Sequence, residues 1–129
     1  MTVFESKEQA VGVFSQLFEL LLQDETFSTR VREAGLSLRL VQSKPDFALH
    51  VSNDGVRVDD TTTPAALTIK MSSDNAHALW SGQLLMPLAL ATGKIRVRGS
   101  VTKMLEFQPL LQPAFDRYPQ IALQAGVTA

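Results

Sequence analysis

Two periodicities divide this chain into expected helices and strands. Near the start, apolar residues recur every three or four positions, which places them along one face of a helix: Val11, Phe14, Leu17, Phe18, Leu21 and Leu22. Ser6, with Gln9 three positions later, fits a capping box, so we expect a helix over residues 7–23. A second helix should follow over 24–34 and end at Gly35.

The middle of the chain alternates between apolar and polar residues, the pattern of strands with one buried face. In the second of these stretches Phe47, Leu49 and Val51 point inward, while Ala48 and His50 point outward. The same alternation predicts five strands near these ranges: 36–42, 46–52, 56–60, 65–71 and 94–98.

Start and stop signals place two short helices between the fourth and fifth strands. The first begins at Ser72 or Ser73 and ends at Gly82. The second begins around Pro87 and ends at Gly93.

The end of the chain is rich in proline. Ser100 can cap a last helix, Pro109 should kink or end it, and residues 113–123 form a short apolar tail segment. The order of elements is helices, a strand meander, two helices, a strand and a helix. This order predicts one domain over residues 1–129 with an α+β fold. A single, mainly antiparallel five-stranded sheet is expected, with the helices packed on one of its faces.

The charge balance limits the classes of partner. The chain has 12 basic and 13 acidic residues and a net charge of -1, which argues against binding driven by nucleic-acid phosphates. It contains no cysteine, and it shows no signal peptide, no apolar run long enough to span a membrane and no C-terminal peroxisomal tripeptide. We therefore expect a cytoplasmic protein that does not bind nucleic acid.

Residues 65–99 carry a pattern typical of one family. They combine a hydrophobic strand, a helix that ends in Ser-Gly, a proline-containing apolar helix and a basic strand, on these residues: Leu67, Ile69, Met71, Ser81-Gly82, Pro87 and Gly93-Lys94-Ile95-Arg96-Val97-Arg98-Gly99. In order and spacing this stretch resembles the sterol carrier protein 2 (SCP2) family of small lipid-binding domains. In that family an asparagine usually precedes the proline, which sits one position earlier, whereas Met86 precedes it here. An acidic residue often follows the last glycine, where this chain has Ser100.

The run of residues 84–91 is apolar on every side, so it must be buried all round, face lipid or face a cavity. The resemblance implies a hydrophobic tunnel between sheet and helices that this region borders, although simple burial remains an alternative. With the wide apolar face of the first helix, it suggests that eight residues line a ligand cavity: Phe14, Phe18, Trp80, Leu84, Leu88, Met104, Phe107 and Leu111. Met86 and Met104 suit an adaptable apolar wall.

Basic residues alternate along the last predicted strand. Lys94, Arg96 and Arg98, with Lys103 beyond, are typical of the wet face of a one-sided sheet. The alternative is a local positive patch that meets an anionic headgroup, a carboxylate or an acidic membrane surface, with salt-sensitive strength.

Catalytic and metal-binding patterns are missing from the sequence. His50 and His77 are not spaced as metal ligands, and the carboxylates of Asp59 and Asp60 fit a solvated loop better than a metal site. Asp74, His77 and Ser81 lie at helical spacing without a nucleophile elbow, which is more typical of a solvent-facing stripe than of a triad. We therefore predict no catalytic residue, no metal and no cofactor.

Three functions remain in play. The leading one, which follows from the resemblance, is a module that binds a fatty acid, acyl-CoA, sterol or isoprenoid in an apolar cavity for carriage or presentation. The second is an accessory or scaffold subunit that presents an apolar substrate to a biosynthetic or catabolic enzyme. Either role involves a lipid or other apolar small molecule and a transient contact with a membrane surface or partner enzyme. The third, an enzyme, is disfavoured by the residue inventory.

Overall fold

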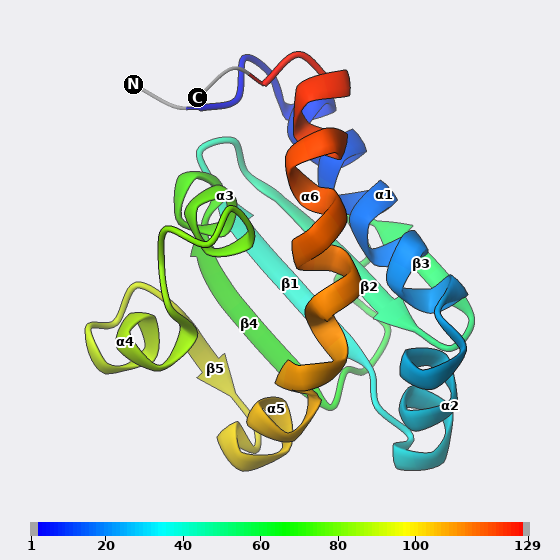
Figure 1. The fold of residues 1–129 in the computed structure, drawn as a ribbon. Coiled ribbons are helices and arrows are strands. Elements are labelled where there is room, and N and C mark those ends of the chain that lie inside the picture. The colour runs from blue at the N-terminus through cyan, green and yellow to red at the C-terminus, as the bar shows by residue number, and fades with distance from the viewer. Residues whose placement is uncertain (1–2, 128–129) are drawn as a thin grey trace.

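Five strands form one mixed sheet, which Figure 1 shows face-on in the computed structural model. The structure describes residues 3–127. The expectation about a C-terminal peroxisomal tripeptide concerns residues 127–129, and residues 128–129 lie outside the described part. The strands are β1 (Leu38–Ser43), β2 (Phe47–Ser52), β3 (Gly55–Val58), β4 (Leu67–Ser72) and β5 (Arg96–Arg98). Each corresponds to one of the five predicted ranges.

The strand order is β3-β2-β1-β4-β5. The first three strands form the expected antiparallel meander, and β5 pairs antiparallel with β4. The meander does not continue into β4, which instead lies parallel to β1, with Leu40 opposite Ile69. The prediction of a mainly antiparallel sheet is confirmed, and the central parallel pair is a feature that alternation alone does not reveal.

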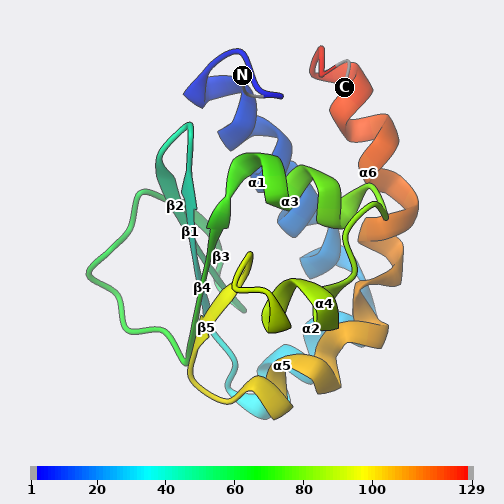
Figure 2. The same ribbon diagram turned by 90° about the vertical axis from the view of Figure 1, so that its left-hand side faces the viewer.

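The connection from β3 to β4 crosses the sheet face opposite the helices (Figure 2). Its start pairs with β2, because the Asp59 backbone N–H donates to the Ala48 carbonyl at 2.6 Å. Further along, His50 Nε2 lies 3.0 Å from the carbonyl oxygen of Pro64. His50 is consequently buried, so the expectation that it points outward is right about the sheet face but wrong about exposure.

The helices cover the other face of the sheet, as Figure 2 shows and as the sequence predicts. They are α1 (Lys7–Gln23), α2 (Glu25–Ala34), α3 (Ser73–Trp80), α4 (Met86–Ala91), α5 (Val101–Phe107), the 3-10 helix η1 (Gln108–Leu111) and α6 (Gln112–Gln124). The predicted capping box is present at α1, where Ser6 Oγ accepts from Gln9 N–H at 3.1 Å. Among the described residues, no helix is long and apolar enough to cross a membrane.

The tail segment is a full helix, α6, which corrects the sequence-based expectation. Pro109 and Pro113 stand in the first turns of η1 and α6, where the missing N–H has no helical partner to lose. The helix packs along α1 (Figure 1) and buries the side chain of Tyr118 completely. Pro109 thus marks the point where α5 ends and η1 begins, as predicted, whereas Pro113 starts a helix that the sequence did not suggest.

Candidate functional site

An apolar cavity lies between the sheet and the helices. Its floor is made by the side chains that β1 and β4 direct toward the helices, together with one residue shortly before β1 and one directly before β5: Leu36, Leu38, Leu40, Gln42, Leu67, Ile69, Met71 and Ile95. The alternation that predicted the strands is what brings these side chains to one face. The floor between Leu38 and Gln42 is about 13 Å long, at the rise of an extended strand.

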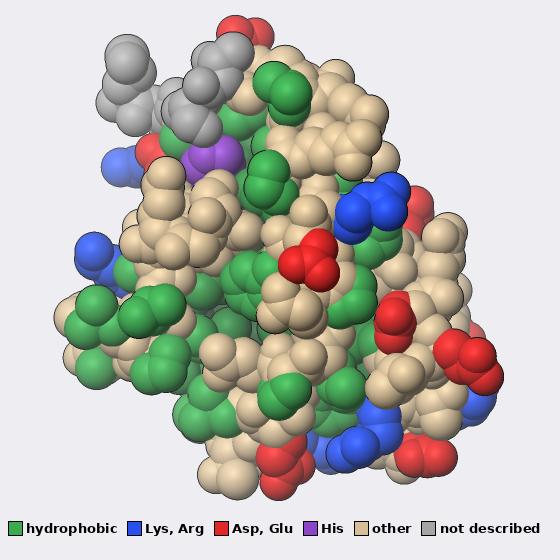
Figure 3. Space-filling view, in the orientation of Figure 1, with side chains coloured by type: hydrophobic (Ala, Val, Ile, Leu, Met, Phe, Trp, Pro, Cys, Tyr) green, Lys and Arg blue, Asp and Glu red, His purple; other side chains and the backbone are tan. Residues whose placement is uncertain are grey.

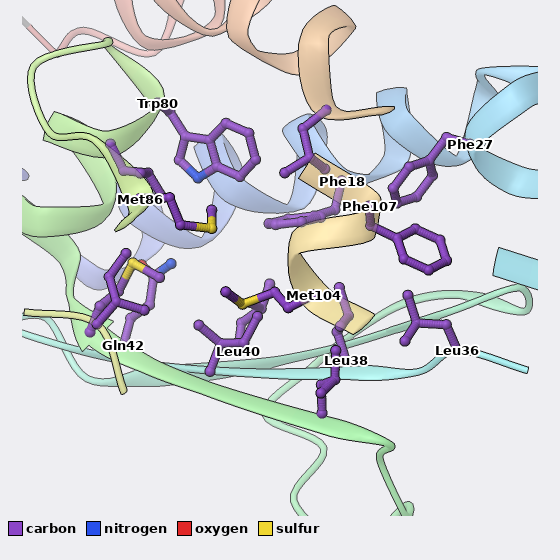
Figure 4. A pocket seen from close by; sticks show the side chains of 16 residues that line it. Phe18, Phe27, Leu36, Leu38, Leu40, Gln42, Trp80, Met86, Met104 and Phe107 are labelled. Carbon is purple, nitrogen blue, oxygen red and sulfur yellow. The ribbon is translucent and has the colours of Figure 1, made fainter. Parts of the chain in front are cut away.

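Side chains from six helical elements form the roof (Figure 4). They are Phe18, Phe27, Leu79, Trp80, Met86, Met104, Phe107 and Leu111. Trp80 and Met86 lie above the Gln42 end of the floor, whereas Phe27 and Phe107 lie above the Leu36 end. The cavity thus runs along β1 from an end with one polar group to an end with two phenylalanines.

Gln42 is the one polar residue among the sixteen that line the cavity. Its side chain is buried, and its Oε1 accepts a long hydrogen bond of 3.4 Å from Ser73 Oγ. Ser73 Oγ has a second acceptor, the Pro45 carbonyl, at 3.2 Å. The Gln42 amide is therefore available to a ligand at little cost to the protein.

The cavity is narrow, with a volume of about 60 Å³. Three of the chain's four methionines contribute to its wall: Met71, Met86 and Met104. Methionine side chains are unbranched and flexible, and they rearrange more easily than β-branched or aromatic ones. The wall can therefore move apart around a bound chain.

The structure brings five of the eight predicted cavity residues into the wall: Phe18, Trp80, Met104, Phe107 and Leu111. Phe14 is fully buried against Phe4, Phe47 and Tyr118 in the core beside the cavity. Leu84 is also buried but lies outside the wall. Leu88 is 56% exposed, so the prediction that it encloses the cavity is wrong.

The misplacement of Leu88 has a simple cause in α4. Within this helix only Met86 and Ala89 are buried, and Leu88 faces away from the wall. Leu85 just before the helix is 66% exposed. Figure 3 shows hydrophobic side chains gathered over α4 and between α4 and α5. The run 84–91 therefore gives the wall one side chain, that of Met86, while Leu84 and Ala89 are buried outside the wall and Leu85 and Leu88 form apolar surface.

Sequence reasoning missed the floor of the cavity. The inward positions of the strands were recognised as apolar, but periodicity does not separate a packed core face from a cavity face. Gln42 was the available signal, because it is a polar residue at an inward position of a strand.

The groups weighed for catalysis have other partners. Asp74 Oδ1 accepts from the Val3 backbone N–H at 2.8 Å. His77, expected on a solvent-facing stripe, is buried, with its Nδ1 2.8 Å from the Tyr118 hydroxyl. Burial raises the pKa of Tyr118. This cluster is a packing contact of α3 with α6.

The carboxylates of Asp59 and Asp60, which the sequence predicts to lie in a loop, are held by partners within the protein. Asp60 accepts hydrogen bonds from Thr62 and Thr63, and those of Thr63 above all hold the pKa of Asp60 well below its usual range. Asp59 pairs with Lys7 Nζ at 2.7 Å. No group of three histidine, cysteine or acidic residues that could hold a metal ion occurs among residues 3–127.

Comparison with known proteins gives a consistent family match. Residues 14–112 match the model of the SCP-2 sterol transfer family. A search of curated proteins returned no match. Among solved structures, sterol carrier protein domain 2 of Helicoverpa armigera superposes with a TM-score of 0.69 at 18% identity, covering 87% of this chain and 94% of that one.

Two further structures share the fold. Sterol carrier protein 2 from Aedes aegypti in complex with the C16 fatty acid palmitate gives a TM-score of 0.59 at 19% identity, covering 80% of this chain and 94% of that one. The ubiquinone synthesis protein UbiJ-SCP2 gives a TM-score of 0.59 at 20% identity, covering 81% and 94%.

Proposed function

Because the chain belongs to the SCP-2 sterol transfer family, we propose that it binds one lipid-like molecule in the cavity described above and carries or presents it without changing it. The observation that carries this proposal is the composition of the wall, in which fifteen of sixteen lining residues are apolar. Such a wall offers no nucleophile and no acid–base pair, only the amide of Gln42. The chemistry that suits it is desolvation of an apolar chain.

The expected affinity follows from the area that leaves water. A ligand that buries about 400 Å² of apolar surface gains roughly 10 kcal/mol at 25 cal/mol per Å². Loss of translational and rotational freedom, at about 4 kcal/mol or more, leaves about 6 kcal/mol at most, which corresponds to a dissociation constant of tens of micromolar or weaker. Fatty acids, acyl-CoA, sterols and isoprenoids all carry enough apolar surface.

Ligand entry must widen the cavity. Pockets that hold small molecules usually measure about 300–1,000 Å³, against about 60 Å³ here. The flexible side chains of Met86 and Met104 in the roof and Met71 in the floor make this expansion inexpensive. The palmitate bound by the Aedes aegypti protein is the kind of ligand that we expect to fit an enlarged cavity.

Native mass spectrometry of freshly purified protein tests this function. We expect part of the protein to carry one extra mass, which solvent extraction releases as a lipid. Protein that stays free of added mass, even after incubation with fatty acid, sterol and isoprenoid alcohol in turn, would contradict the proposal. The sequence favours the cytoplasm as the place of action.

A second candidate function is that of an accessory subunit that presents an apolar substrate to an enzyme. It is favoured by the exposed apolar side chains beside the cavity: Leu85, Leu88, Val101 and Leu105. The likeness to UbiJ-SCP2 is consistent with such a role. Lipid transfer between vesicles with no other protein present separates the two functions, because a carrier transfers lipid by itself and an accessory subunit does not.

A further inference from the structure

A basic groove borders the cavity at its Gln42 end. Its volume is about 510 Å³, and its lining comes from the ends of β1 and β4, from α3 and from the segment that leads into β5: Val41, Gln42, Ser43, Lys70, Met71, Ser72, Asn75, Thr92, Gly93, Lys94 and Arg96. Three of these side chains are cationic and none is acidic. We propose that this groove binds the phosphate-class headgroup of an amphiphile whose apolar chain fills the cavity, an inference that rests on the proposed function.

In the part of the chain that the structure describes, none of the three groove cations forms an ion pair with an acidic side chain. Within residues 3–127, the ion pairs join Lys7 with Asp59 and Arg57 with Asp60. The side chains of Lys70, Lys94 and Arg96 are all exposed. The surrounding sequence adds to the imbalance, because residues 61–105 contain five basic residues and a single acidic one. The groove is thus locally positive on a chain whose net charge is -1.

Two of the cations lie directly beside each other on neighbouring strands of the sheet. Lys70 of β4 is in register with Arg96 of β5 in an antiparallel pair, and both side chains line the groove. Directly opposed residues have Cβ atoms about 5 Å apart, and like charges at such positions destabilise the pair. An anion between them removes this cost, since each cation then gains a charge-assisted hydrogen bond.

The groove and the cavity meet at the open end of β4. Gln42 and Met71 line both spaces. On its β5 side, β4 is paired only through residues 68–70, so Met71 and Ser72 have no strand beside them there. Across this gap Asn75 Nδ2 donates to the Lys94 carbonyl at 3.4 Å, which is a long and weak contact. A chain whose headgroup sits in the groove can pass this gap into the cavity.

The number and placement of the cations favour phosphate over a neutral or smaller headgroup. A neutral hydroxyl, as in a sterol, would leave all three cations without an anionic partner. A single carboxylate has two oxygens, whereas a phosphate or diphosphate offers three or more acceptors, enough to meet Lys70, Lys94 and Arg96 together. Free inorganic phosphate shares this chemistry, but it would not connect the groove with the cavity.

The test compares dodecyl phosphate with 1-dodecanol, which share a chain and differ in the headgroup. Dodecyl phosphate is used below its micelle concentration and 1-dodecanol below its solubility limit, and Trp80 emission reports entry of the chain, because Trp80 lines the cavity. We expect dodecyl phosphate to bind about fivefold more tightly at low ionic strength and to lose this advantage as salt is added.

Substitutions of the groove residues test whether their charges cause the preference for dodecyl phosphate over 1-dodecanol. Lys70→Gln and Arg96→Gln should each reduce the advantage of dodecyl phosphate and leave dodecanol binding unchanged. Arg98→Gln is the matched control, because Arg98 lies on the same strand and sheet face but outside the groove. Lys70→Gln should also raise the thermal unfolding midpoint of the ligand-free protein, since it removes one of two opposed like charges.

The outcomes separate this inference from the proposed function. Equal affinities for the two amphiphiles in the wild type, unchanged by Arg96→Gln, would overturn the headgroup site and leave the lipid-binding function standing. Inorganic phosphate that binds as tightly as dodecyl phosphate would show a free anion site and overturn the link to the cavity. Failure of both amphiphiles to bind would overturn both proposals.

Discussion

Phe18 of α1 and Trp80 of α3 meet edge to face in the cavity roof, with ring centroids 5.8 Å apart and ring planes at 85°. The indole also packs against Phe115, with ring centroids 4.9 Å apart. Both Phe18 and Trp80 line the cavity, and Trp80 is the chain's only tryptophan. Its emission therefore reports on the roof without interference from elsewhere.

Filling the cavity from its floor should exclude a ligand and keep the fold. In Leu40→Phe the larger ring occupies space that a ligand would use, and we expect the free energy of unfolding to change by less than about 1.5 kcal/mol. Affinity for dodecanoic acid, measured by calorimetry, should fall about tenfold or more, because less apolar ligand area leaves water. Leu88→Phe is the control, since Leu88 is exposed and outside the wall. Equal binding by both variants would place the ligand elsewhere.

A charge at position 88 should be tolerated. A charge in an apolar cavity wall would carry a desolvation cost, but Leu88 is 56% exposed and lies outside the wall, so a charge there stays hydrated. We expect Leu88→Asp to change the free energy of unfolding by no more than about 0.5 kcal/mol. Ile69→Asp, in the buried floor, should cost several kcal/mol. Chemical denaturation of the two variants measures both values, and similar losses would contradict the placement of α4.

Two glycine substitutions should act in opposite directions. Gly99 has φ +118°, and a Cβ there would lie 2.8 Å from the Ala66 carbonyl oxygen. Gly99→Ala should therefore destabilise the protein by about 1–3 kcal/mol. Gly12 lies within α1 with open space around it, so Gly12→Ala should stabilise by up to about 1 kcal/mol. Thermal unfolding distinguishes the two, and a neutral Gly99→Ala would show that β5 enters α5 by another route.

Stability should decline at alkaline pH because of Tyr118. Burial raises its pKa above the ordinary value of 10.0, so the neutral hydroxyl is favoured in the folded state. The contribution is complete below pH 10, where the phenol is neutral in both states, and it is lost as pH rises and only the unfolded chain ionises.

Tyr118 is the chain's only tyrosine, so tyrosinate absorbance follows this one group. We expect it to appear together with unfolding rather than at pH 10. Tyr118→Phe should be less stable near neutral pH, because His77 loses a hydrogen-bond partner at 2.8 Å, but its stability should fall less above pH 10. Ionisation of Tyr118 near pH 10 in the folded protein would contradict this.

The sequence predicted most elements because their signals are local. The capping pair at Ser6 and Gln9 predicted the start of α1, and the alternation around Ile69 and Val97 predicted strands that are present. The parallel pairing of β1 with β4 could not be predicted, because it depends on a loop that crosses the far face of the sheet.

The candidate site was harder to predict because it depends on which way a side chain faces. Trp80 and Met104 were placed correctly in the wall, but Leu88 and Met86, two positions apart on α4, face in different directions. His77 looked solvent-facing because its partner, Tyr118, comes from a helix that the prolines concealed. Both errors arise from tertiary contacts that no short sequence window contains.

The most direct test of lipid binding in the cavity uses the methionine methyl groups. Met71, Met86 and Met104 all line the wall, so carbon-13 methyl labelling places three probes around the proposed ligand. On titration with dodecanoic acid, we predict that these three signals shift together, saturate at one ligand per protein and show nuclear Overhauser contacts to the acyl chain. Methyl signals that stay unchanged in the folded protein at saturating fatty acid would contradict a ligand in this cavity.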